Sequence, residues 1–146
     1  MDKMDKMDKK VISKEKLIFK PIPAHTEEVA KMVIDAAFKV HTALGPGLLE
    51  SVYETCLAHE LNERHVKFES QITLPIIYSG ITVESGLRLD LLVEKCIIIE
   101  TKAIEILNPI HKAQLLTYLK LSGVRLGLLI NFNVIHLRDG IIRLVN

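Results

Sequence analysis

The first part of the chain places its apolar residues at the spacing of a helix. Apolar residues recur at this spacing between Val29 and Val40, so a helix is predicted there. Its start is placed near Thr26, a favourable N-cap residue, and the Gly-Pro-Gly sequence at 45–47 ends it. A second apolar stripe with the same period predicts another helix over residues 48–64.

The period then changes from helical to alternating. Residues 66–78 and 87–91 alternate between apolar and polar and predict two strands, with a turn at Gly80. Residues 96–103 predict a third strand, which is followed by a helix over 110–121 that Gly123 closes. A buried strand is predicted over 125–130. Two short strands, near 134–136 and 141–145, are predicted to form a hairpin around an Asp-Gly turn.

This order of elements predicts an α/β fold of the mixed α+β type, with a central mixed β-sheet flanked by helices. The length of 146 residues suits one domain, which we place at residues 26–146. Residues 1–25 are interpreted as a flexible N-terminal tail and lead-in, because they open with a threefold Met-Asp-Lys repeat.

Composition and charge narrow the choice of function only slightly. With 49% apolar and 25% charged residues the chain is globular rather than disordered. A net charge of +1 gives no global attraction to nucleic acid, so any such contact depends on a local patch. Cys56 and Cys96 lack the spacing of a disulfide framework or zinc site. No apolar run approaches the ~20 residues of a membrane span, and the start resembles no signal peptide. We expect a cytoplasmic protein with no membrane partner.

The sequence Ile97-Ile98-Ile99-Glu100-Thr101-Lys102 places charge on a strand that should be buried. Three consecutive isoleucines predict a strand that is covered on both faces and is therefore central in its sheet. Glu100 and Lys102 are two residues apart and point to the same face. Burying either charge alone would cost several kcal/mol. Each side chain therefore needs a partner or an ion.

The preceding strand carries Arg88 and Asp90, which are also two residues apart. Whether Asp90 and Glu100 share a face depends on the loop between the strands. A two-residue loop at Glu94 and Lys95 would put them on opposite faces, whereas a three-residue loop or one bulge would put them on the same face. A functional site requires the second arrangement.

If the two carboxylates do meet, they form a hard-oxygen site that suits Mg²⁺ or Mn²⁺ rather than zinc. Such a metal would bind a phosphate and lower the pKa of a bound water. Lys102 could orient or deprotonate that water, or stabilise charge in the transition state. A buried salt bridge between Lys102 and one carboxylate is the structural alternative. The presence of Asp90 ten residues upstream favours a site.

The arrangement of Asp90 with Glu100-Thr101-Lys102 resembles the PD-(D/E)XK nuclease superfamily, and Gly47, Glu50 and Tyr53 match the pattern of its GxxExxY branch. The resemblance runs from residue 27 to the C-terminus. It rests on five segments in order: 47–53 (GLLESVY), 89–93 (LDLLV), 99–103 (IETKA), 114–120 (QLLTYLK) and 127–132 (GLLINF). It implies a restriction-endonuclease-like core. Leu89 stands where the superfamily pattern has proline.

The resemblance also implies roles for individual residues. Asp90 and Glu100 would be metal ligands, with the Thr101 carbonyl as a third, and Lys102 would be the catalytic lysine. Glu50 matches an acidic helix residue that assists metal binding, although a glutamate there also stabilises a helix N-terminus.

Three further residues are candidates for contacting substrate. Gln114 and Tyr118 resemble the QxxxY element of the RecB-like branch, and residues four apart lie on one helical face. Arg88 either pairs with a neighbouring side chain or contacts a phosphate. Tyr53 is predicted to be a packing residue.

The sequence therefore predicts a Mg²⁺- or Mn²⁺-dependent nuclease acting on DNA, or on RNA. A catalytically silent module that binds nucleic acid or protein on the same fold is the alternative. A third hypothesis is a subunit that needs a partner, either a second copy in a homodimer or another protein, because a chain of this length has little beyond the core fold.

Overall fold

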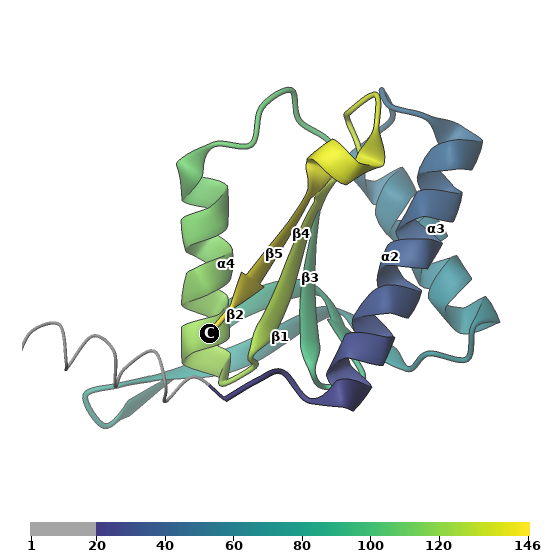
Figure 1. Cartoon of the computed structure of the whole chain (residues 1–146). Helices are drawn as coiled ribbons and strands as arrows, with labels where there is room; N and C mark the ends of the chain where they lie inside the picture. The colour runs from purple at the N-terminus through teal and green to yellow at the C-terminus, as the bar shows by residue number, and fades with distance from the viewer. Residues whose placement is uncertain (1–19) are drawn as a thin grey trace, which may run out of the picture.

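A computed structural model describes residues 20–146, so most of the predicted tail lies outside the described residues. A five-stranded sheet has helices on both faces (Figure 1). The helices are α2 (Ala24–Leu44), α3 (Glu50–Glu63) and α4 (Pro109–Ser122), and η1 (Leu137–Gly140) is a short 3₁₀ helix. The strands are β1 (Phe68–Tyr78), β2 (Ile81–Val93), β3 (Ile97–Lys102), β4 (Leu126–Asn131) and β5 (Ile141–Val145).

The sheet has the order β1-β2-β3-β4-β5, with β3 in the middle. Only β3 and β4 run parallel, and α4 makes the crossover between them; the other neighbours are antiparallel. This mixed sheet confirms the predicted fold class. The end of β3, the end of β4 and the starts of α3 and α4 lie along the upper edge in Figure 1.

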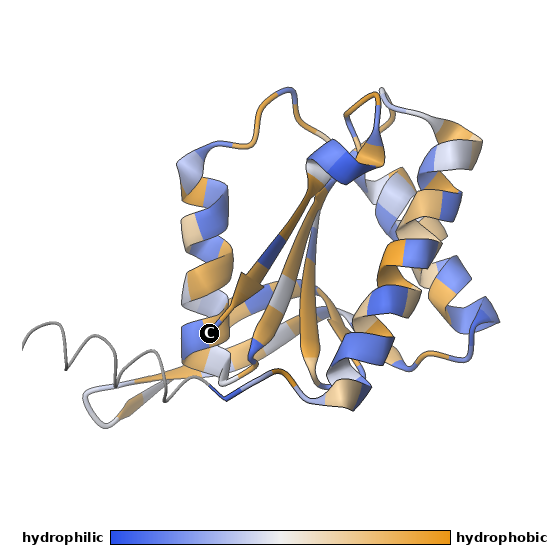
Figure 2. Cartoon of the chain, viewed as in Figure 1, coloured by the Kyte–Doolittle hydropathy of each residue, from blue (hydrophilic) through white to orange (hydrophobic). Residues whose placement is uncertain are grey.

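The three isoleucines of β3 explain why this strand is central. Ile97 and Ile99 pack in the larger core cluster, which also contains Val33 of α2 and Leu57 of α3. Ile98 points the other way, into the cluster that α4 covers. In Figure 2 most of β3 is correspondingly coloured as hydrophobic, whereas β1 and β2 also carry polar segments. The prediction that this strand is buried on both faces is confirmed.

Helix α2 begins earlier than predicted. Pro23 is its N-cap residue, and Thr26, expected to cap the helix, lies inside the first turn with 6% of its surface exposed. Pro23 makes no side-chain cap hydrogen bond, and its carbonyl accepts the first helical bond from the Glu27 N–H at 3.1 Å. For α4, Pro109 and Gly123 were expected to mark the two ends of the helix. Pro109 is its first residue, and Gly123 ends it in the left-handed conformation, as expected.

The predicted C-terminal hairpin is wrong. Residues 134–136 form bends rather than a strand, η1 follows them, and β5 pairs with β4 instead. Close packing explains this path: a Cβ on Gly140 would lie 2.1 Å from the carbonyl oxygen of Asn131 at the end of β4. The chain therefore turns directly back onto β4. His41 of α2 holds the loop through a 2.8 Å contact between its Nε2 and the Val134 carbonyl.

Strands β1 and β2 form a long hairpin that extends beyond the rest of the sheet. Strand β2 pairs with β3 only from Leu91 to Val93, whereas its earlier residues pair with β1 alone. The tip leaves Ile77 and Tyr78 exposed. Among residues 20–146, no helix is long and apolar enough to cross a bilayer.

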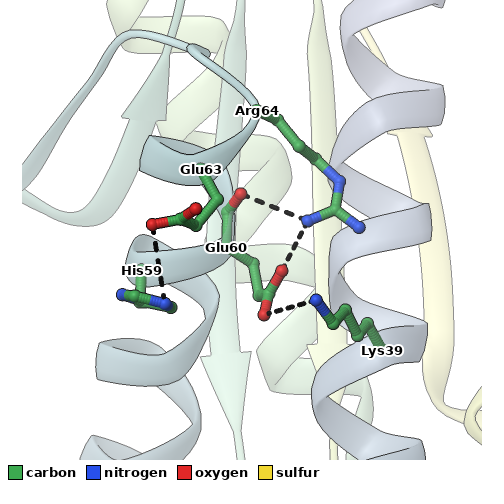
Figure 3. Close-up of polar contacts among 5 residues, drawn as sticks. All are labelled: Lys39, His59, Glu60, Glu63 and Arg64. Atoms are coloured by element: carbon green, nitrogen blue, oxygen red, sulfur yellow. Dashed lines mark hydrogen bonds and ion pairs between the residues drawn. The ribbon is translucent and has the colours of Figure 1, made fainter.

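Polar contacts join α2 to the C-terminal half of α3 (Figure 3). Glu60 accepts from Arg64 at 2.6 Å and from Lys39 of α2 at 3.4 Å, and His59 lies 3.9 Å from Glu63. The His59–Glu63 pair is exposed and adds little to stability, whereas Glu60 is mostly covered, with 12% of its side chain exposed. Of these contacts, the one between Lys39 and Glu60 joins the two helices. It helps to fix the tilt of α3, whose first residue lies at the opposite end of the helix.

Candidate active site

The loop between β2 and β3 decides the register of the two acidic strands. It has three residues, Glu94 to Cys96, because β2 ends at Val93 and β3 begins at Ile97. The pairing continues to Leu91 opposite Ile99. Extending this register by one residue places Asp90 opposite Glu100. The three-residue loop that the functional hypothesis required is therefore present.

The backbone ladder ends where these two carboxylates meet. Asp90 has no backbone partner in the pairing of β2 with either neighbour. Its N–H donates instead to Glu100 Oε1 at 3.2 Å. Asp90 Oδ2 in turn accepts from the Thr101 N–H at 2.9 Å and from the Thr101 hydroxyl at 3.2 Å. Each carboxylate thus replaces a backbone acceptor of the opposite strand, which fixes both side chains in place.

Glu100 is a buried acid next to another acid. Only 5% of its surface is exposed. Burial, followed by the charge of Asp90, raises the pKa of Glu100 to about 8, although the Asp90 N–H and the charge of Lys102 act in the opposite direction. A cation bound between the two carboxylates would remove this conflict.

Glu50, the first residue of α3, faces the same charges. Partial burial and the Asp90 charge raise its pKa, while the charge of Lys102 lowers it. The three side chains are therefore close enough to interact across the edge of the sheet.

Tyr53 fixes the start of α3 at the edge of the sheet where the carboxylates lie. Its ring is buried and stacks on Phe132 with ring centroids 4.7 Å apart. Its hydroxyl donates to the Gly45 carbonyl at 2.6 Å and accepts from the Leu48 N–H at 3.1 Å. The tyrosine thereby anchors the loop that precedes Glu50. The prediction that Tyr53 is a packing residue is confirmed.

Gln114 and Tyr118 approach from α4. Gln114 Nε2 donates to the Tyr118 hydroxyl oxygen at 3.1 Å. Partial burial and the negative charges of Glu100 and Asp90 raise the pKa of Tyr118, so the tyrosine keeps its proton. Because its oxygen already accepts from Gln114, this proton is free to be donated elsewhere.

Two polar residues at the site were missed by the sequence analysis. Glu54 Oε1 accepts from Gln71 Nε2 at 2.7 Å, and the same nitrogen lies 3.4 Å from Asp90 Oδ1. The Nε of Arg88 donates to Gln71 Oε1 at 3.0 Å, so Arg88 does pair with a neighbour of Asp90. Glu54 lies one turn after Glu50 on the same face of α3, and that spacing was the available signal.

Asn131 fixes the backbone that follows the acidic strand. Its Oδ1 accepts from the Ile104 N–H at 3.1 Å and from the Asn133 N–H at 3.2 Å, while its Nδ2 donates to the Ile104 carbonyl at 2.9 Å. The Phe132 N–H also donates to the Lys102 carbonyl at 2.9 Å. The end of β4 therefore holds the end of β3 in register.

The set of metal-binding atoms is small. Among residues 20–146, no three His, Cys, Asp or Glu side chains converge closely enough to hold an ion by themselves. Asp90 and Glu100 each keep one oxygen free of short hydrogen bonds from residues 20–146. Mg²⁺ is commonly held by one or two carboxylates together with waters and substrate phosphates, so this pair fits such an ion better than zinc.

Comparison with models of protein families gives a match over most of the chain. The family model described as the PD-(D/E)XK nuclease superfamily matches residues 27–144. This range includes nearly all of α2 and extends almost to the end of β5. No curated protein and no solved structure matched the chain.

Proposed function

Because the chain belongs to the PD-(D/E)XK nuclease superfamily, we propose that it hydrolyses phosphodiester bonds of DNA, or of RNA, with Mg²⁺ or Mn²⁺ as cofactor. Membership indicates a nuclease-type function, and nucleases of this superfamily typically use divalent metals. One observation carries the proposal for this chain: Asp90 and Glu100 meet where the β2–β3 ladder ends. Lys102 lies on the same strand as Glu100, close enough to lower its pKa.

Asp90 and Glu100 would hold the metal, with the Thr101 carbonyl as a further oxygen and Glu50 acting from α3. The bound ion would supply Lewis-acid activation of a water and of the scissile phosphate. Because Glu100 is buried, water screens its charge little. Its attraction to a bound cation would therefore be strong.

Lys102 would orient the attacking water and stabilise negative charge on the phosphate oxygens. Its backbone carbonyl accepts from the Phe132 N–H at 2.9 Å, so the strand that carries it is fixed. A charged group on a backbone that is already held in place needs little reorganisation as charge develops, which is the basis of electrostatic catalysis.

Substrate contacts would come from α4 and β2. The proton of Tyr118 is available to a phosphate oxygen because Gln114 donates to the tyrosine oxygen. Arg88 is exposed and uses its Nε to bind Gln71, which leaves its two terminal nitrogens for a phosphate. These contacts fit a nucleic-acid backbone and carry no base preference.

We also assign the chain to the GxxExxY branch. Each residue of that pattern has a physical role here. Gly47 adopts a positive φ of 100°, Glu50 opens α3 beside the carboxylates, and Tyr53 anchors the intervening loop. In this proposal, Gly47 and Tyr53 shape the start of α3 so that Glu50 lies beside the carboxylates.

The proposal is tested by incubating labelled single-stranded DNA, double-stranded DNA and RNA with the protein in Mg²⁺, Mn²⁺ or excess chelator. We expect cleavage in the metals and none in chelator. Asp90→Ala should remove the activity, whereas Asp139→Ala, which changes an exposed aspartate of η1, should retain it. Cleavage that survives chelator or Asp90→Ala would refute the proposal.

A catalytically silent module is the second candidate function. It is favoured by the absence of a third carboxylate or histidine close enough to complete a metal site among residues 20–146. The same assays separate the two candidates. Nucleic acid that is bound in a gel-shift experiment but never cleaved in any of the metals would support the silent module.

A further inference from the structure

Gln71 has an unusual backbone for its position. It lies within β1 but has a positive φ of 49°, which is uncommon for a residue other than glycine and strains the backbone. Its neighbours pair normally, Ser70 with Leu91 and Ile72 with Leu89, but Gln71 and the facing Asp90 do not. The distortion in β1 therefore lies directly opposite the metal-binding aspartate proposed above.

The side chain of Gln71 connects three elements. Its amide nitrogen donates to Glu54 of α3 at 2.7 Å and lies 3.4 Å from Asp90 Oδ1, and its amide oxygen accepts from Arg88 Nε at 3.0 Å. These partners fix which way the amide points. A carboxylate only accepts and a guanidinium only donates, so a flipped amide would lose all three contacts.

We propose that Gln71 is a positioning residue that couples the Asp90 carboxylate to the phosphate-binding end of Arg88. The inference rests on the proposed function and deepens it. The amide nitrogen bridges the two neighbouring carboxylates of Glu54 and Asp90, which offsets their repulsion and fixes the direction of Asp90 Oδ1. The amide oxygen sets the position of the guanidinium, whose two terminal nitrogens then face a phosphate.

The strain is consistent with this role. In an extended backbone the side chains of neighbouring residues alternate between faces, so a regular β1 would fix the direction of the Gln71 side chain by register alone. The left-handed conformation breaks that alternation at the one position where the side chain meets Glu54, Asp90 and Arg88. Residues that orient metal ligands typically change metal affinity about 10–100-fold when replaced.

The test uses two substitutions with opposite effects on the backbone. Gln71→Met keeps the length of the side chain and removes its hydrogen bonds, and Gln71→Gly removes the side chain while relieving the backbone strain. Ser70→Met is the matched control, because Ser70 is the exposed neighbour outside this network. Binding of Mn²⁺ is measured by calorimetry, and KM and kcat are measured on labelled DNA.

We expect both Gln71 variants to bind Mn²⁺ roughly tenfold more weakly and to show a raised KM, while Ser70→Met behaves as wild type. Arg88→Ala should raise KM in the wild type but have a smaller effect in the Gln71→Met protein, because the two residues act together. Wild-type binding that both Gln71 variants retain would overturn this inference alone. A wild type that neither binds Mn²⁺ nor cleaves nucleic acid would overturn the proposed function as well.

Discussion

Replacing Lys102 with alanine is expected to lower the rate of phosphodiester cleavage by about a thousandfold, with little change in Mn²⁺ binding. In the proposed mechanism the lysine acts on the reacting water and phosphate, whereas Asp90 and Glu100 hold the ion. Its backbone is fixed by pairing with Asn131 and by the bond from the Phe132 N–H, so removing the side chain should leave the fold intact. Single-turnover cleavage and calorimetry measure the two effects separately.

Lys112→Ala is the matched control for this prediction. Lys112 is an exposed lysine of α4, so its removal makes the same change in net charge away from the acidic strands. We expect the control to cleave at close to the wild-type rate. Equal rates for Lys102→Ala and the wild type would contradict a catalytic role for the lysine.

Replacing Glu100 with glutamine is expected to stabilise the metal-free protein at alkaline pH. The folded-state pKa of Glu100 is raised to about 8 from an ordinary value of 4.5, mainly by burial. Between these values the folded protein binds more protons than the unfolded chain, so stability falls as pH rises through this window. Glutamine removes that loss, which we expect to be about 2–4 kcal/mol when Glu100 is fully ionised.

The measurement is urea unfolding in chelator at several pH values from about 5 to 9. The wild type should lose stability across this range more steeply than Glu100→Gln. Added Mn²⁺ should restore the wild type at alkaline pH but leave the variant unchanged. Glu105→Gln removes an exposed carboxylate from the loop after β3 and controls for net charge. Parallel pH profiles for wild type and Glu100→Gln would contradict a strained, buried carboxyl.

Much of the sheet could be predicted because its strands differ in how they are buried. The isoleucine run of β3 is apolar on both faces, and an interior strand of a two-sided sheet needs that pattern, as the fully buried β4 also shows. The polar interruption at Glu100 and Lys102 was visible for the same reason. The length of the loop between β2 and β3 could not be predicted from the sequence, because Cys96 could belong either to the strand or to the turn. In the structure it is the last residue of the turn.

The errors come from features that depend on the rest of the fold. Residues 134–136 have a strand-like composition, but the edge of β4 was free for β5, and Gly140 allows the chain to pass close to Asn131. Thr26 has the chemistry of an N-cap, yet packing buries it within the first turn of α2.

Gln71 and Glu54 illustrate why the candidate site was only partly predicted. An exposed glutamine in a strand interrupts no apolar pattern, and its left-handed backbone has no signature in its residue type. Their involvement depends on α3 lying against the β1–β2 hairpin, a tertiary contact. The proposed roles of Asp90, Glu100 and Lys102 remain predictions that the geometry supports.

The most direct test of the account is calorimetric titration of Mn²⁺ into the wild type and into Asp90→Ala. The account predicts binding by the wild type that disappears in the variant, because the variant loses one of the two carboxylates that face the ion. Unfolding of both proteins in chelator checks that the variant is folded. Equal binding by both proteins, or none by the wild type even with substrate DNA present, would contradict a metal centre between β2 and β3.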